Sequence, residues 1–83
     1  MKFRIHVRIM PRRGLLDPQG QAVEHALKAL RFDQASSVHV GKAIEFDLEA
    51  ATPEEAAAEA KIMCDKLLAN PVTEDYQVKV EAA

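Results

Sequence analysis

Cysteine and glycine are scarce in this chain of 83 residues. The single cysteine, Cys64, has no partner for a disulfide within the chain, so we expect a cytoplasmic protein. The three glycines are too dispersed to form a glycine-rich phosphate loop. No apolar run approaches the length of a membrane-spanning helix, and the alternating N-terminus does not fit a signal peptide. The sequence therefore predicts one globular domain over residues 1–83, with no membrane partner.

The net charge is small, but the charged residues are unevenly distributed along the chain. The net charge is −2, which argues against a general nucleic-acid binder. Residues 1–16 contain no acidic side chain, and residues 45–59 contain no basic one. This asymmetry favours a structural explanation in which the two segments face each other.

Strict alternation of apolar and polar residues predicts the strands. It covers residues 2–9, where the apolar members are Phe3, Ile5, Val7 and Ile9, and recurs over residues 76–80. Residues 36–50 are typical of two strands around a tight turn, with Gly41-Lys42 as the two-residue turn. Four strands are therefore expected.

Two helices are predicted between the strands. The first covers residues 18–30, with Asp17 as N-cap and Pro18 at the first position, and its apolar stripe is Val23, Ala26, Leu27 and Leu30. Gly20 in its first turn is unexpected, since glycine costs a helix roughly 1 kcal/mol relative to alanine. The second helix begins at the Thr52 cap and ends at Asn70-Pro71, with a buried stripe of Ala56, Ala60, Met63, Cys64 and Leu67.

This order, β-α-β-β-α-β, predicts an α+β fold with a ferredoxin-like antiparallel sheet and two helices on one face. The first strand then lies beside the third, so that one charged set faces another on the open side of the sheet: Arg4, His6 and Arg8 against Glu45, Asp47 and Glu49. We favour a solvated, self-neutralised face over a docking face. Because a chain this short has a modest core, oligomerisation is expected.

No set of residues indicates catalysis or metal binding. The histidines, His6, His25 and His39, are dispersed and do not have metal-ligand spacing to Cys64. Arg12 and Arg13 precede a helix N-terminus and are a candidate anion contact. Acylphosphatases share the element order but need an asparagine on a central strand, whereas Asn70 lies at a helix end.

Two binding modules also share this order of elements. RNA-recognition modules need aromatic side chains on the open face, but Phe3 and Phe46 are expected on the helix-facing side. A small-molecule regulatory module of the ACT type, which binds ligands between subunits, remains an alternative.

The chain resembles the PurS family, the small subunit of phosphoribosylformylglycinamidine synthase. The resemblance is carried by LLDPQGQAVEHAL, VGKAIEFDLEA and MCDKLLANPVTEDYQVKVE, and covers almost the whole chain. Its most specific combination is residues 16–20, then Gly41-Lys42, then residues 67–71. The chain departs from the family mainly at Arg12-Arg13.

The resemblance implies a non-catalytic subunit of an ATP-dependent ligase that transfers nitrogen from glutamine during purine biosynthesis. A PurS oligomer, a dimer or a tetramer, would bridge a PurL synthetase subunit and a PurQ glutaminase subunit and support ammonia transfer. ATP and Mg²⁺ would bind to the large partner, and no cofactor or nucleic acid to this chain. The expected contact regions are Asp17, Gln19 and Gly20, then Gly41-Lys42, then Asn70-Pro71. At Gly20 an interface is slightly favoured over an intrachain contact.

Overall fold

The computed structural model describes residues 1–15 and 17–83, and Leu16 of the family motif lies outside the described residues. Three strands and two helices follow one another, and a short π-helical segment, η1, extends the second helix. Their bounds are β1 Lys2–Pro11, α1 Pro18–Ala29, β2 Lys42–Glu49, α2 Pro53–Met63, η1 Cys64–Leu68 and β3 Glu74–Ala82.

The sheet is antiparallel, with the strand order β2-β1-β3. β1 is central because its alternating residues can pair on both sides, with β2 from Lys2↔Glu49 to Ile9↔Lys42 and with β3 along the other edge. Its apolar side chains are 0–2% exposed and form the centre of the core: Phe3, Ile5, Val7 and Ile9. The predicted neighbours, residues 2–9 and 43–49, are confirmed.

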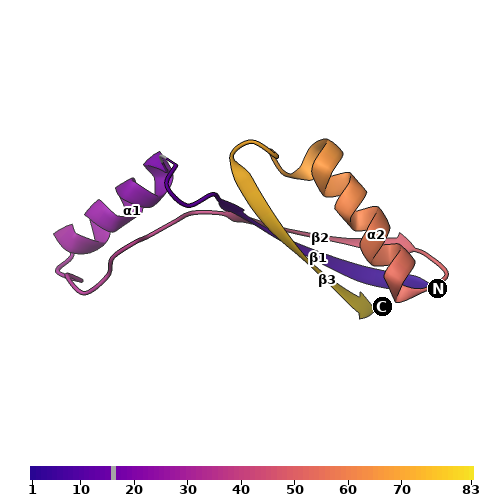
Figure 1. The fold of residues 1–83 in the computed structure, drawn as a ribbon. Coiled ribbons are helices and arrows are strands. Elements are labelled where there is room, and N and C mark those ends of the chain that lie inside the picture. The colour runs from indigo at the N-terminus through magenta and orange to yellow at the C-terminus, as the bar shows by residue number, and fades with distance from the viewer. Residues whose placement is uncertain (16) are drawn as a thin grey trace.

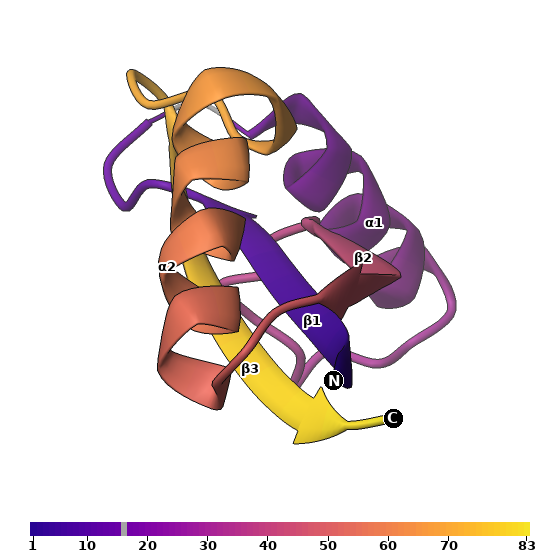
Figure 2. The same cartoon turned by 90° about the vertical axis from the view of Figure 1, so that its right-hand side faces the viewer.

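α2 covers one face of this sheet, over β1 and β3 (Figure 2). It begins as the sequence predicts, since the Thr52 hydroxyl accepts a hydrogen bond from the Glu55 amide at 3.1 Å. Ala56 and Ala60 are fully buried, and their small side chains let the helix approach the sheet closely. Cys64 continues this buried row.

The end of the second helix differs from the predicted stripe. In η1 the Ala69 amide donates to the Cys64 carbonyl, which is one residue farther than in an α-helix. The extra residue rotates the following side chains, so that Leu67 is 82% exposed and Ala69 is buried in its place. The predicted burial of Leu67 is therefore wrong.

The predicted strand around Val38 and Val40 is absent from the described sheet. The amides that would pair with a neighbouring strand donate instead to carboxylates of α1 and its N-cap. The Val38 amide donates to Glu24, and the Val40 amide donates to Asp17. Ser37 adopts a φ of +54°, which also interrupts an extended conformation. Three strands are therefore described instead of the four predicted.

Gly41-Lys42 does not form the predicted hairpin turn. Lys42 is the first residue of β2 and pairs with Ile9 of β1. A Cβ atom on Gly41 would overlap the Ile9 carbonyl oxygen and the Met10 sulfur. Glycine is needed here for the close approach of two backbones, not for a turn.

α1 stands apart from the sheet, at the far end of an elongated molecule (Figure 1). The principal extents are 50 × 26 × 14 Å. The α+β class is confirmed, but the prediction that both helices cover one face is wrong, because α1 is held by its return segment rather than by the sheet. Among the helices of residues 1–15 and 17–83, none is long and apolar enough to cross a membrane.

Candidate interaction surfaces

A set of carboxylate–amide hydrogen bonds joins α1 to residues 38–40, and we call it the α1 clamp. Asp17 caps the helix by accepting from the Gly20 amide at 3.0 Å, and its second oxygen accepts from the Val40 amide at 3.0 Å. Glu24 accepts from the Val38 amide at 3.1 Å. These bonds favour the charged carboxylates, so the amides of Gly20 and Val40 lower the pKa of Asp17 and the Val38 amide lowers that of Glu24.

Gly20 is buried inside this clamp. A Cβ atom at this position would overlap the Val38 carbonyl oxygen and the Asp17 carboxylate. A close contact within the chain thus explains why position 20 is a glycine. The sequence had slightly favoured an interface with another chain at this position. A contact between Gly20 and another chain is not needed to explain the residue.

The clamp brings two of the predicted contact regions together. Asp17 and Gly20 come from the start of α1, while Gly41 and Lys42 follow directly after Val40 at the start of β2. Gln19 and Lys42 are exposed beside them. Sequence reasoning missed the amides of Val38 and Val40, because no local pattern pointed to Glu24 and Asp17 as their acceptors.

The other predicted residues gather at the same end of the sheet but on its β3 edge, because Ile9 pairs with Lys42 and Pro11 pairs with Glu74. Asn70 turns the chain, since its carbonyl accepts from Thr73 and Glu74. The Arg12 amide donates to the Thr73 carbonyl at 2.9 Å. The Arg12 guanidinium Nε lies 3.2 Å from Asp75 Oδ1, so a carboxylate of the same chain occupies this candidate anion contact. Arg13 and Pro71 are exposed nearby in the sequence.

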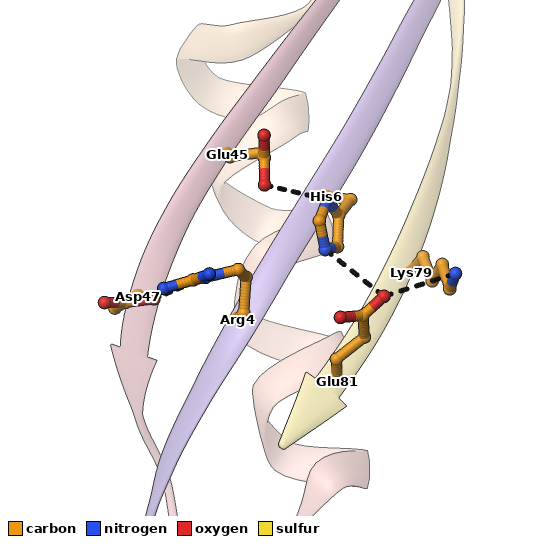
Figure 3. Close-up of polar contacts among 6 residues, drawn as sticks. All are labelled: Arg4, His6, Glu45, Asp47, Lys79 and Glu81. Atoms are coloured by element: carbon orange, nitrogen blue, oxygen red, sulfur yellow. Dashed lines mark hydrogen bonds and ion pairs between the residues drawn. The ribbon is translucent and has the colours of Figure 1, made fainter. Parts of the chain in front are cut away.

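Charged residues of all three strands meet on the open face of the sheet (Figure 3). His6 lies between two carboxylates: Nδ1 is 3.2 Å from Glu45 and Nε2 is 3.4 Å from Glu81. Arg4 donates to Asp47 at 3.3 Å, and Lys79 pairs with Glu81 at 3.2 Å. The predicted facing of the first two basic residues with Asp47 and Glu45 is confirmed, whereas Arg8 faces Ala43.

An open groove lies on this same face, toward the α1 end. Its volume is about 810 Å³, and residues of β1, β2, β3 and the segment before β2 line it, among them His6, Arg8, Met10, His39, Glu45 and Lys79. His39 Nδ1 is 3.4 Å from Asp17 Oδ2, which ties the groove to the α1 clamp.

The reactive side chains of the chain do not form a catalytic arrangement where the structure describes them. Cys64 is buried, and burial raises the pKa of its thiol, as does the nearby Asp65 carboxylate. Such a thiol is a weak nucleophile at neutral pH. Among residues 1–15 and 17–83, no three His, Cys, Asp or Glu side chains cluster as metal ligands.

A family model and individual relatives match this chain, and both point to the same protein family. The family model for PurS, phosphoribosylformylglycinamidine (FGAM) synthase, matches residues 4–82. The phosphoribosylformylglycinamidine synthase subunit PurS of Synechocystis is 46% identical over 81 residues, covering 95% of this chain and 77% of the relative.

Solved structures agree with the sequence match. PurS from Methanocaldococcus jannaschii, a subunit of formylglycinamide ribonucleotide amidotransferase, superposes with a TM-score of 0.86 at 36% identity, covering 98% of each chain. A chain of PurLQS from Thermotoga maritima gives a TM-score of 0.88 at 30% identity, covering 96% of this chain and 98% of that one. On these matches, which span the whole fold, the chain belongs to the PurS family of phosphoribosylformylglycinamidine synthase subunits.

Proposed function

We propose that this chain self-associates and joins the PurL synthetase and PurQ glutaminase subunits of phosphoribosylformylglycinamidine synthase, where it supports ammonia transfer without an active site of its own. The similarity to a chain of PurLQS over 96% of the length carries this proposal. The buried Cys64 and the self-paired charges of the open face fit a subunit that binds rather than reacts. The family match favours this role over an ACT-like regulatory module.

The same proposal states where the cofactors bind and in which compartment the chain works. ATP and Mg²⁺ bind to the large partner, where the ligase chemistry occurs, and this chain folds as one domain in the cytoplasm. The predicted contact regions reach the partners from one end of the sheet, where the C-terminal end of β1 lies between the starts of β2 and β3. The α1 clamp with Gln19 and Lys42 lies on the side of β2, and Asn70-Pro71 with Arg13 lies on the side of β3.

Reconstitution tests this function. Purified PurL and PurQ are assayed with and without this chain for formylglycinamidine ribonucleotide formation, first with glutamine and then with ammonium chloride as nitrogen donor. We expect the chain to be required with glutamine and dispensable with ammonium, because free ammonia bypasses the passage between subunits. Equal glutamine-dependent turnover without the chain would contradict the proposal.

A further inference from the structure

The charge pattern on the open face of the sheet changes along β1. Arg4 and His6 each have a carboxylate of β2 opposite them (Figure 3). Arg8, the next residue on this face, has Ala43 opposite it on β2 and Gln77 on β3. Because neither of these two neighbours is charged, the face neutralises itself at one end and leaves an uncompensated cation at the other.

The carboxylates around Arg8 are bound by other basic groups. Glu45 lines the open-face groove together with Arg8, but it pairs with His6 at 3.2 Å. Asp75 lines a smaller pocket on the other side of Arg8, but it pairs with Arg12 at 3.2 Å. Over residues 1–15 and 17–83, Arg8 itself forms no ion pair. Its guanidinium therefore keeps its N–H donors for an acceptor outside the chain.

The open-face groove has room for a small organic molecule next to Arg8. Its volume of about 810 Å³ lies within the range of about 300–1,000 Å³ that is usual for small-molecule sites. Apolar side chains, those of Met10 and Ala43, line part of it, and the imidazole rings of His6 and His39 line another part. A thioether and flat rings are surfaces against which a planar organic group packs well.

The charge of the groove favours an anion. Among its described lining residues, three side chains are basic, those of Arg8, Lys42 and Lys79, and only that of Glu45 is acidic. Lys79 also pairs with Glu81, at 3.2 Å. The whole chain has a net charge of −2, so this excess of positive charge is local. An arginine fork binds phosphate with two parallel hydrogen bonds, and ammonium groups beside it add point charges.

We propose that the open-face groove binds a small phosphate monoester, with its phosphate on the Arg8 guanidinium and its organic part against Met10 and Ala43. A phosphate monoester carries nearly two negative charges at neutral pH, which suits several basic groups better than a single carboxylate does. The groove is much larger than a bare phosphate ion, so the organic part also has a place. This site is separate from the linking function, and the reconstitution with PurL and PurQ does not decide it.

Titration calorimetry on the full chain provides the first test. Adenosine monophosphate serves as the probe, because it joins a phosphate monoester to a planar group, and adenosine and inorganic phosphate each represent one half of it. We expect the probe to bind at least about 10-fold more tightly than either half. Binding should weaken as sodium chloride is added, because salt screens exposed charges. In NMR spectra the amide signals of Arg8, Ala43 and Gln77 should shift on binding.

Two arginine variants test the position of the phosphate. Arg8→Gln should weaken binding of the probe by at least about 10-fold, because charge-assisted hydrogen bonds are lost. Arg4→Gln makes the same change on the same face of the same strand, but its guanidinium already donates to Asp47 at 3.3 Å. This control should bind the probe within about 2-fold of wild type.

A second pair of variants tests the missing carboxylate opposite Arg8. Ala43→Glu places an acidic side chain there, as Asp47 stands opposite Arg4, and should weaken binding at least about 10-fold although Arg8 is unchanged. Ala43→Gln has nearly the same size without the charge and should retain binding within about 3-fold. Position 43 is exposed, so both variants should fold.

The contrary outcomes are equally definite. A dissociation constant for the probe above about 10 mM would contradict the site. Equal losses in Arg4→Gln and Arg8→Gln would show a diffuse effect of charge and contradict the contact with Arg8. Inorganic phosphate that bound as tightly as the probe would contradict the place of the organic part. Equal losses in Ala43→Gln and Ala43→Glu would contradict the electrostatic argument.

Discussion

Substitution of Gly20 by alanine sets two effects of opposite sign against each other. Helix propensity favours alanine over glycine by about 1 kcal/mol. The added Cβ, however, overlaps the Val38 carbonyl oxygen and the Asp17 carboxylate. Overpacking of this kind costs typically about 1–3 kcal/mol.

The overlap should win because its partners have little freedom to move. Glu24 holds the Val38 amide at 3.1 Å, and Asp17 is bound to two amides at 3.0 Å, those of Gly20 and Val40. We therefore expect a cost toward the upper end of that range and a net loss of about 1–2 kcal/mol in the opening free energy of the clamp. That loss corresponds to amide exchange that is roughly 5–30-fold faster.

Hydrogen exchange followed by NMR at the amides of α1, Val38 and Val40 measures this change directly, because exchange reports local opening. Ala22→Gly, at an exposed position of the same helix, provides the matched control for propensity alone. Slower exchange in Gly20→Ala than in wild type would refute the reasoning. It would show that glycine is merely tolerated and that residues 38–40 do not approach the helix as described.

Further predictions concern the core and the acid range. Ile5→Ala should lower the free energy of unfolding by about 2–5 kcal/mol in urea titrations, because Ile5 is fully buried, whereas Leu67→Ala should change it by less than about 0.5 kcal/mol. A loss of more than about 2 kcal/mol in Leu67→Ala would contradict the π-helical turn, because it would show that Leu67 is buried. The lowered pKa values of Asp17, Glu24 and Glu81 stabilise the folded state above the pKa values of the unfolded chain. That stabilisation should be lost as the pH falls below about 4, and Asp17→Asn should flatten this acid limb in pH-dependent hydrogen exchange; an unchanged limb would contradict the role of the clamp.

Most of the correct predictions came from two kinds of sequence pattern, the alternation of apolar and polar residues in strands and the residue types at helix N-caps. The buried row of β1 and the antiparallel neighbour β2 follow from a period of two, and both N-caps, Asp17 and Thr52, follow from residue type. These signals are local or depend on one face of a strand. These predictions therefore do not depend on contacts with distant parts of the chain.

The errors arise where a polar contact between distant residues decided the conformation. The amides of Val38 and Val40 fit a strand pattern, but carboxylates 14 and 23 residues earlier bind them instead. Asp17 was correctly predicted as the cap of α1, yet the segment that it binds, around Val40, was not visible in any local pattern. Leu67 was misplaced because one hydrogen bond, from Ala69 to Cys64, adds a residue to a turn.

The central position of β1 has a consequence for how the chain folds. Ile9 pairs with Lys42, Phe3 pairs with Ala82, and neither pairing is a hairpin between consecutive segments. Long loops must close before the first strand–strand contacts form, and the chain entropy lost in closing them is offset only by those contacts. Refolding should therefore take milliseconds to seconds rather than microseconds, and during that delay β1 remains an unprotected template for wrong pairing.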